Sequence, residues 1–230
     1  MVFDLTGIIL MVVIFGVSMA AQGYLTSTFR KFSQIRNARN VTGAEVARDI
    51  LDSNGLQRVS VEVTPGFLTD HYDPMKKVVR LSEVNYNSPS LAALAVAAHE
   101  VGHAIQDAKS YAPLVVRSAL AGPLMIAANL GQLALFAGLL FLASSLGQTF
   151  LLIGIIGLAA VLLFHVITLP VEFDASNRAL AILETNGYLS RQENQGAKKV
   201  LTAAALTYVV AALASAAQLL YYLGFLRSED

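Results

Sequence analysis

The sequence contains no cysteine. Disulfide bonds and thiolate metal ligands are therefore excluded, and any metal site must be built from His, Asp or Glu side chains. Charged residues are also scarce, at 14% of the 230 residues, whereas soluble domains contain about 25%. Together with a hydrophobic content of 55%, this deficit predicts a membrane protein. The formal net charge of zero gives no indication of a nucleic-acid partner.

Four segments are apolar over the roughly 20 residues that a membrane-spanning helix needs. They comprise residues 3–22, 119–143, 149–169 and 203–223. The first segment begins "MVFDLTG", and its basic residues follow the apolar run, so we expect a retained anchor and not a cleaved signal peptide. The sequence thus predicts a mainly α, multi-pass membrane protein with about four transmembrane helices, folded as a single domain over residues 1–230.

The distribution of basic residues predicts the orientation of the chain in the membrane. With four spans, the polar regions 23–118 and 170–202 lie on the same side, and they contain fifteen of the sixteen Lys and Arg residues. Basic residues close to membrane ends are retained in the cytoplasm. We therefore expect a plasma or inner membrane protein, surrounded by the lipid bilayer, with both polar regions facing the cytoplasm.

The first polar region has the pattern of a small α+β unit. A short amphipathic helix begins near Thr42, and alternating residues predict strands at Val59–Val63 and Lys76–Ser82. Ser88 as N-cap and Pro89 at the first helical position then predict a helix that runs to about Lys109.

That helix contains the pattern His-Glu-Val-Gly-His. Residues four apart lie on one helix face, so His99 and His103 can bind one ion together. Glu100 lies next to that face and can act as general base toward a zinc-activated water, as in the HExxH pattern of zinc metallopeptidases. Composition alone predicts about 0.002 occurrences of this pattern in the chain. The alternative interpretation is a hydrogen-bonded histidine pair with an incidental glutamate.

Two histidines and a water leave zinc one ligand short. His71 lies in a turn, where a solvent-exposed histidine is expected, and His165 lies inside the third apolar segment, where it would face other helices. Glu172, in "LPVEFDAS", follows that segment and Pro170, at the start of a predicted cytoplasmic helix. Glu172 is either a solvated acid at a helix start or the third ligand. A bound metal would compensate its charge if it is buried.

The stretches "AAHEVGHAIQ", "YAPL" with Arg117, and "LPVEFDAS" resemble the YugP-like family of membrane zinc metallopeptidases over nearly the whole chain. More distantly, the arrangement is similar to integral-membrane gluzincins such as the heat-shock membrane protease and the CAAX prenyl proteases. The resemblance implies Zn²⁺ as cofactor and His99, His103 and Glu172 as ligands. It also implies Glu100 as general base and a cytoplasmic, gluzincin-like site at the membrane boundary.

The sequence departs from the distant relatives at one position. Those proteins usually have an aspartate four residues after the ligand glutamate, which orients a ligand histidine, and here that position is Ser176. Asp174 and Asp107 are the other candidates for orienting the zinc histidines, and Asp107 lies four residues after His103 on the ligand face.

In the resembling proteases, an edge strand above the HExxH helix pairs with an extended peptide substrate. The strand at Lys76–Ser82 directly precedes this helix, so it is either that substrate-binding strand or an ordinary member of a small sheet. Candidate donors for transition-state stabilisation are Tyr86, Asn177 and Arg178.

The sequence therefore predicts a membrane-bound zinc metalloendopeptidase that hydrolyses peptide bonds of membrane or membrane-proximal proteins. Three alternatives remain. A catalytically inactive metal-binding scaffold would keep the fold but would not need Glu100. An intramembrane site-2-type protease would have its HExxH inside a spanning helix and an aspartate in a later span. A zinc transporter would have ionisable residues inside several spans.

Overall fold

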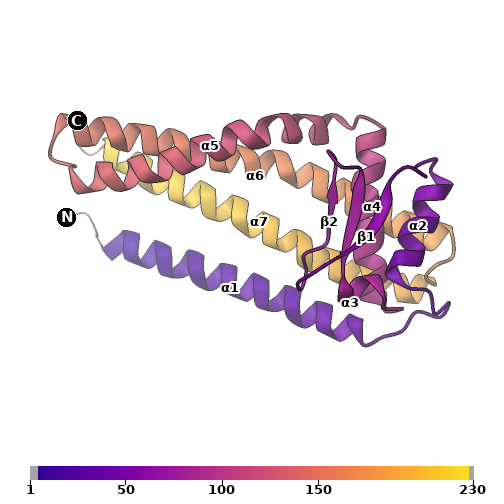
Figure 1. Cartoon of the computed structure of the whole chain (residues 1–230). Coiled ribbons are helices and arrows are strands. Elements are labelled where there is room, and N and C mark those ends of the chain that lie inside the picture. The colour runs from indigo at the N-terminus through magenta and orange to yellow at the C-terminus, as the bar shows by residue number, and fades with distance from the viewer. Residues whose placement is uncertain (1–4, 228–230) are drawn as a thin grey trace. The chain divides into compact units, whose positions relative to one another are not determined.

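The structure is a computed structural model that describes residues 5–227, with side chains described as far as residue 224. The chain is mainly helical (Figure 1). The helices are α1 (Leu5–Ser33), α2 (Gly43–Ser53), α3 (Glu83–Tyr86), α4 (Leu91–Ala108), α5 (Ala112–Leu140), α6 (Ser145–Thr185) and α7 (Arg191–Arg227), and the strands are β1 (Ser60–Thr64), β2 (His71–Asp73) and β3 (Val78–Ser82).

The residues divide into two compact units, where the sequence predicted one domain. We call the first the helical unit; it consists of Met1–Ala21, Val116–Leu169 and Thr207–Asp230. The second, the mixed unit, consists of Gln22–Val115 and Pro170–Leu206, and it contains the sheet and the HExxH helix. Helices α1, α5, α6 and α7 each contribute residues to both units.

Within residues 5–227, four helices are long and apolar enough to cross a membrane, namely α1, α5, α6 and α7. This confirms the predicted mainly α, multi-pass membrane protein with four spans. The helices are longer than the apolar segments: α6 continues through Pro170 as far as Thr185, and α7 already begins at Arg191. Residues 170–202 therefore comprise the end of α6, a turn and the start of α7, whereas the sequence predicted a separate helix after Pro170. Membrane-protein helices tolerate an internal proline, which removes only one backbone hydrogen bond.

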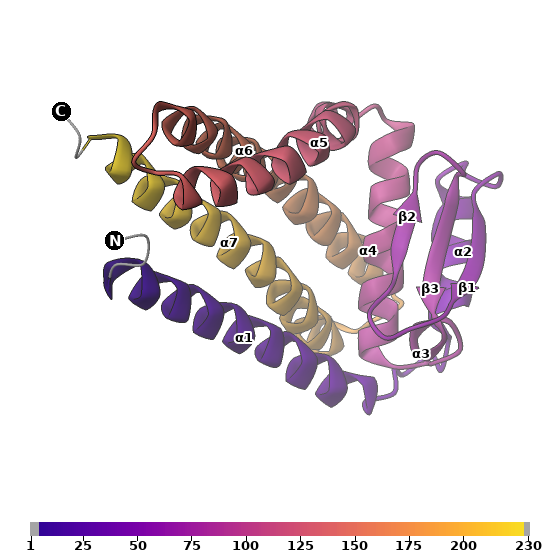
Figure 2. The same ribbon diagram turned by 60° about the vertical axis from the view of Figure 1, so that its left-hand side comes forward.

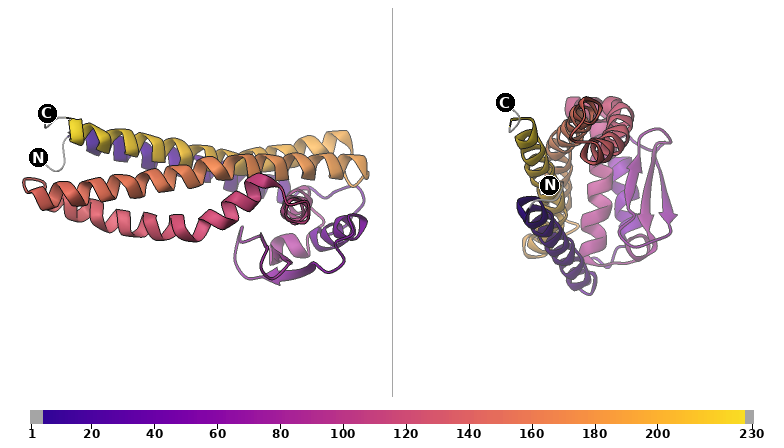
Figure 3. Two further views of the ribbon diagram at one scale, coloured as in Figure 1. Left: turned by 90° about the horizontal axis from the view of Figure 1, so that it is seen from above. Right: turned by 90° about the vertical axis from the view of Figure 1, so that its left-hand side faces the viewer.

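In the helical unit, α5 and α6 are joined by a tight turn and run back alongside each other (Figure 3). A Cβ atom at Gly131 would lie 2.5 Å from the Cα atom of Gly157, so these two helices are in backbone contact there. Small residues permit this close approach, which provides van der Waals packing where lipid offers no hydrophobic driving force.

The sheet of the mixed unit has the strand order β1-β3-β2, with β1 parallel and β2 antiparallel to β3 (Figure 2). Strand β3 lies in the centre, and Val78, Val79 and Leu81 are buried. Of the two alternatives for Lys76–Ser82, the structure thus favours the ordinary member of a small sheet over the substrate-binding edge strand. The sequence also missed β2, which begins at His71 within the segment interpreted as a turn.

Helix α4 begins at Leu91, two residues later than the predicted start. The Oγ atom of Ser90 accepts a hydrogen bond from the backbone N–H of Ala93, so Ser90 and not Ser88 is the N-cap. The carbonyl groups of Ser88 and Pro89 accept hydrogen bonds from the backbone N–H groups of Gly43 and Asn37. These long-range bonds keep residues 88–89 extended, which the local sequence does not reveal.

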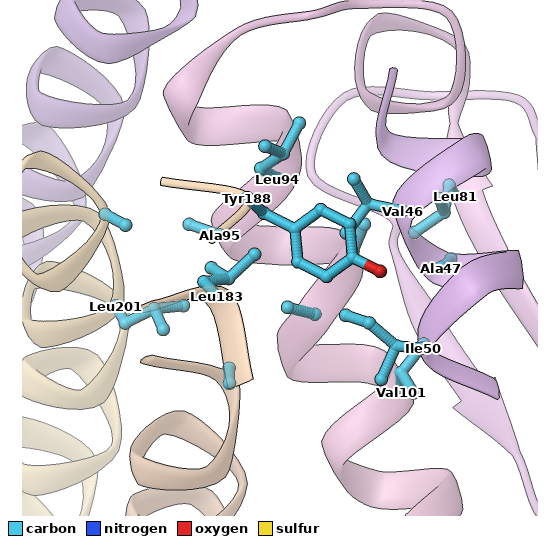
Figure 4. Close-up of a cluster of buried hydrophobic side chains, with 14 of the residues drawn as sticks. Val46, Ala47, Ile50, Leu81, Leu94, Ala95, Val101, Leu183, Tyr188 and Leu201 are labelled. Atoms are coloured by element: carbon cyan, nitrogen blue, oxygen red, sulfur yellow. The ribbon is translucent and has the colours of Figure 1, made fainter. Parts of the chain in front are cut away.

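The core of the mixed unit surrounds α4, which is buried along nearly its whole length. Leu94 and Val101 of α4 pack with Ile50 of α2 and Leu183 of α6 (Figure 4). The Tyr188 ring lies within this cluster, and its hydroxyl group donates a hydrogen bond to Asp49 of α2. The HExxH residues are therefore on a rigid element.

Candidate metal centre

The two histidines of the HExxH pattern lie one turn apart on α4, and Glu172 lies on α6. The two helices are in backbone contact at Gly102. A Cβ atom at this position would lie 2.8 Å from the backbone oxygen of Ala175, closer than real Cβ contacts. The glycine between the two histidines thus permits the approach that brings the Glu172 carboxylate to both rings.

The three side chains form a compact cluster. The Oε2 atom of Glu172 is 3.3 Å from Nε2 of His99 and 3.7 Å from Nε2 of His103. The ring centroids of the two histidines are 4.7 Å apart, and the rings are inclined at 82°. One potential ligand atom from each of the three residues lies within 4.8 Å of the others.

These separations fit a zinc ion. Ligand atoms about 2.0–2.1 Å from a tetrahedral zinc lie about 3.3–3.4 Å from one another. Two imidazole nitrogens and a carboxylate oxygen also form a donor set that zinc binds in catalytic sites, with one coordination position left open. The distance from Glu172 to His99 has this value, and the distance to His103 is about 0.3–0.4 Å longer, so the residues present suit this metal.

Glu100 is buried, with 8% of its surface exposed. Burial is the main reason why the pKa of Glu100 is raised; the charges of Glu172 and Asp70 raise it further, whereas His99 and His103 lower it. A raised pKa makes the Glu100 carboxylate a stronger proton acceptor than an ordinary glutamate.

Burial by itself lowers the pKa of His103. The hydrogen bond with Glu172 and the negative charges of Glu100 and Glu172 outweigh this effect, so the pKa of His103 is raised. The same negative potential favours a metal cation at this position.

The Nδ1 atom of each histidine ring has its own partner. For His103 the partner is Oε1 of Gln106, at 2.9 Å, and for His99 it is the hydroxyl oxygen of Ser176, at 3.1 Å. When Nδ1 carries the proton and donates to these oxygens, the Nε2 lone pair of each ring is available to bind a metal ion beside Glu172. Ser176 therefore lies beside His99 in the position where the distant relatives have an aspartate.

Gln106 is fully buried and connects α4 to α6. Its Nε2 group donates hydrogen bonds of 2.8 Å to the backbone oxygen of Val171 and to Oδ2 of Asp174. Because both donors are used, Oε1 must face His103. Asp174 and His103 are thus connected by two hydrogen bonds, one to each end of the Gln106 amide.

The sequence interpretation did not identify Gln106. The signal was nevertheless present, since Gln106 follows His103 by three residues and lies on the same helix face. Asp107, the other predicted candidate, accepts hydrogen bonds from the Tyr72 hydroxyl at 2.6 Å and from Nζ of Lys77 at 2.5 Å.

The remaining candidates lie outside the cluster of three. His71 is exposed, and its Nδ1 atom is 2.9 Å from the backbone oxygen of Thr69. His165 belongs to the helical unit, where Nδ1 lies 2.8 Å from the hydroxyl oxygen of Ser215. Among the candidate donors, Arg178 is paired with Asp174, Asn177 is exposed, and Tyr86 packs against the core of the mixed unit.

Two imidazole nitrogens and a carboxylate oxygen are the protein ligands of many peptidase zinc sites. In the described part of this chain they occur together with four helices that are long and apolar enough to span a membrane. The fold and the site therefore define a membrane protein of the zinc metallopeptidase class.

Comparison with known proteins agrees with this class. The chain belongs to the family described as "Putative neutral zinc metallopeptidase", which matches residues 7–227. It is 45% identical over 224 residues to the "Putative membrane protease YugP" of Bacillus subtilis (strain 168). The alignment covers 97% of this chain and 98% of that protein. No solved structure matches the chain significantly. Zinc is thus the cofactor, and the chain is membrane-associated.

Proposed function

We propose that the protein is a membrane-bound zinc metalloendopeptidase that hydrolyses peptide bonds of membrane or membrane-proximal proteins. His99, His103 and Glu172 hold the zinc ion, and Glu100 is the general base. The observation that supports this proposal most directly is the Glu172 Oε2 atom at 3.3 Å and 3.7 Å from the two Nε2 atoms.

A zinc ion in this site supplies a Lewis acid that polarises a carbonyl group and makes a water molecule acidic. Glu100 accepts a proton from that water and returns it to the leaving amine nitrogen, so one residue serves both halves of the reaction. Gln106 and Ser176 bond Nδ1 of the two imidazole rings, which would leave Nε2 of each ring to bind the zinc ion. Glu100, His103 and Glu172 are all buried, which limits the access of bulk water to them.

Two observations weigh against the site-2-type alternative. Helix α4 has 18 residues and is not among the four helices apolar enough to span a membrane. The third potential ligand, close to both histidines, is the glutamate Glu172 and not an aspartate of a later span. The inactive scaffold remains an outcome of the test below.

An extended substrate requires an edge strand, and β3 is central. Of the two edge strands, β2 is connected to α4 through the hydrogen bond from Tyr72 to Asp107, one turn beyond His103. We therefore assign the substrate-pairing edge to β2. Peptides with N-methylated backbones test this assignment, because blocking their N–H groups is expected to weaken binding without changing the side chains.

The site faces the cytoplasm in this proposal, because fifteen of the sixteen Lys and Arg residues lie in regions 23–118 and 170–202. Suitable substrates are then segments close to the inner membrane face.

The general base is tested with purified full-length protein in lipid nanodiscs. Glu100→Gln keeps the size of the side chain but cannot accept the proton, so we expect zinc content to persist and cleavage of casein or of a membrane-protein substrate to be lost. General-base catalysis contributes about 10²–10⁴-fold. Glu83→Gln, at an exposed position on α3, is the matched control and keeps both properties. Equal cleavage by the Glu100→Gln and wild-type proteins contradicts the assignment, and no cleavage by either favours the inactive scaffold.

The ligand assignment is tested separately by the zinc content of Glu172→Ala. We expect lower occupancy after dialysis against a mild chelator, because the site loses one of its three protein ligands. Occupancy equal to that of wild type removes Glu172 from the ligand set.

A further inference from the structure

The loop between β1 and β2 presents an uncharged tip. Residues Pro65–Thr69, which we call the apolar loop, read Pro-Gly-Phe-Leu-Thr. The first charged residue after them is Asp70, and its carboxylate accepts hydrogen bonds from the Ser82 N–H at 2.7 Å and from Asn85 Nδ2 at 2.9 Å. The negative charge of Asp70 is thus stabilised by these hydrogen bonds and does not belong to the apolar loop.

The conformation of the apolar loop exposes one aromatic ring. Leu68 has a φ angle of +56°, which is uncommon for a leucine, and its side chain packs against the core of the mixed unit. The hydroxyl of Thr69 donates a 3.0 Å hydrogen bond to the backbone oxygen of Pro65. This compact turn leaves Phe67 46% exposed. Strained backbone of this kind often occurs at functional positions.

The exposed ring lies against the end of an apolar stretch of α1. The ring centroids of Phe67 and Phe29 are 5.3 Å apart in an edge-to-face arrangement. From Leu5 to Phe29 helix α1 contains no charged residue, and Arg30 and Lys31 follow directly. These 25 residues span about 37 Å, and the hydrocarbon core of a bilayer is about 30 Å thick. The helix therefore leaves the hydrocarbon close to Phe29, at the level of the headgroups.

Tyr24 lies on the same helix and is half exposed. Its position is consistent with the headgroup level, since tyrosine residues are enriched at the membrane–water interface. We propose that the apolar loop inserts Phe67 into the membrane interface beside α1. The partner is the phospholipid bilayer, and the inserted depth is about 5–10 Å from the headgroup boundary, as for other interfacial apolar residues.

The opposite end of the sheet is charged and exposed, as expected for a region in contact with water. The register pairs His71 with Arg80 and Asp73 with Val78, so the apolar loop and the turn at residues 74–77 lie at opposite ends of the sheet. That turn contains Lys76 and Lys77, and Met75 is 91% exposed. The apolar loop is therefore uncharged and the opposite turn contains two lysines, which favours an orientation with the apolar loop toward the lipid.

The inference extends beyond peptide hydrolysis and does not depend on it. It gives the mixed unit a second attachment to the bilayer, in addition to its spanning helices. A peptide substrate is the competing occupant of an exposed aromatic ring; the lipid is favoured because the ring packs on α1 directly before Arg30 and Lys31.

The sequence contains no tryptophan, so Phe67→Trp introduces a single fluorophore. The full-length variant is reconstituted in nanodiscs of anionic phospholipid, with or without lipids brominated near the headgroup end of the acyl chain. We expect the brominated lipids to quench the emission of the Phe67→Trp protein and iodide to leave it largely unchanged. Met75→Trp is the matched control at the other end of the sheet, and we expect the opposite pattern.

Quenching of the Phe67→Trp protein by iodide to the same extent as Met75→Trp, with none by brominated lipid, overturns the proposal. An emission change that occurs only on addition of peptide substrate also overturns it and assigns the ring to substrate binding. Because the chain has no cysteine, bimane attached to Phe67→Cys and Met75→Cys repeats the comparison if the tryptophan disturbs folding. Retained zinc content identifies the folded variants.

Discussion

At the scale of single residues, the orientation of the zinc histidines depends on amide chemistry. A buried glutamine has two N–H donors and an acceptor oxygen, and at Gln106 both ends are occupied. The backbone oxygen of Val171 and the carboxylate of Asp174 accept from the amide nitrogen, which leaves the amide oxygen for His103. The neutral Gln106 amide thereby links the Asp174 carboxylate to His103, a proposed metal ligand.

Replacing Gln106 by methionine preserves approximate length and removes every hydrogen bond. We expect zinc affinity to fall by about 10–100-fold, which is typical when the partner of a metal-bound histidine is lost. The measurement is a competition titration with a chromophoric chelator. Gln57→Met is the control, because this exposed amide bonds only the backbone oxygen of Asp52. An unchanged zinc dissociation constant in Gln106→Met contradicts the positioning role.

The individual site residues differ in how far the sequence predicts them. His99, Glu100 and His103 form a local pattern whose helical geometry follows from their spacing. Glu172 lies 69 positions after His103, and its role followed from a missing ligand and a family resemblance. Ser176 was predicted only as the residue that replaces the aspartate of the distant relatives. Gln106 was not predicted, because carboxylates are the more usual partners of zinc-bound histidines.

At the scale of the elements, the decisive contact is the crossing of α4 and α6. Helix α4 is buried on nearly all sides, so its apolar residues do not mark one face as the contact with α6. Gly102 identifies the face that contacts α6. The backbone of Ala175 comes so close to Gly102 that a Cβ atom there would clash with it. The crossing places Glu172 against the rings of His99, three residues before Gly102, and His103, the residue directly after it.

Gly102→Ala tests this crossing. The added methyl group would lie 2.8 Å from the Ala175 oxygen, so the helices must separate by several tenths of an ångström. We expect the free energy of unfolding to fall by about 1–3 kcal/mol, as for other overpacked cores, and zinc affinity to fall with it. Thermal unfolding in a mild detergent and chelator competition provide the two measurements.

Gly16→Ala in α1 is the matched control, since a Cβ atom there would meet no atom within 4 Å. The helix preference of alanine should keep this variant at least as stable as wild type. If Gly102→Ala behaves like Gly16→Ala, close contact at Gly102 is not required for the site.

Element boundaries show where local rules were insufficient. The capping box of α2, formed by Thr42 and Glu45, lies where the sequence predicts a helix start. The start of α4 is shifted from the predicted Ser88 to Ser90, because the preceding carbonyls bond to residues 37 and 43. Pro170 does not end α6, and Glu172 is therefore held within a long helix instead of in a first turn.

At the scale of the whole molecule, the open question of greatest consequence is which side of the membrane the mixed unit occupies. The positive-inside rule predicts the cytoplasm. The absence of cysteine makes this prediction directly testable by single-cysteine labelling. Met75→Cys reports on the mixed unit, and Ala143→Cys reports on the turn between α5 and α6; both positions are exposed.

We expect a membrane-impermeant maleimide to label Ala143→Cys in intact cells and Met75→Cys only after the cells are permeabilised. The reverse pattern would place the candidate zinc site outside the cytoplasm and would redirect the search for substrates. Zinc content of each purified variant serves as the folding control.

The sequence by itself determined the membrane class, the four spans and the HExxH pair, because hydrophobic length and helical spacing are local properties of the chain. The tertiary structure decided which carboxylate meets the histidines, which strand lies at the edge of the sheet and which side chains orient the rings. These features depend on backbone contacts and hydrogen bonds between residues far apart in the chain, such as Gly102 with Ala175 and Gln106 with Asp174. No local pattern specifies those contacts, since they form only when the helices pack.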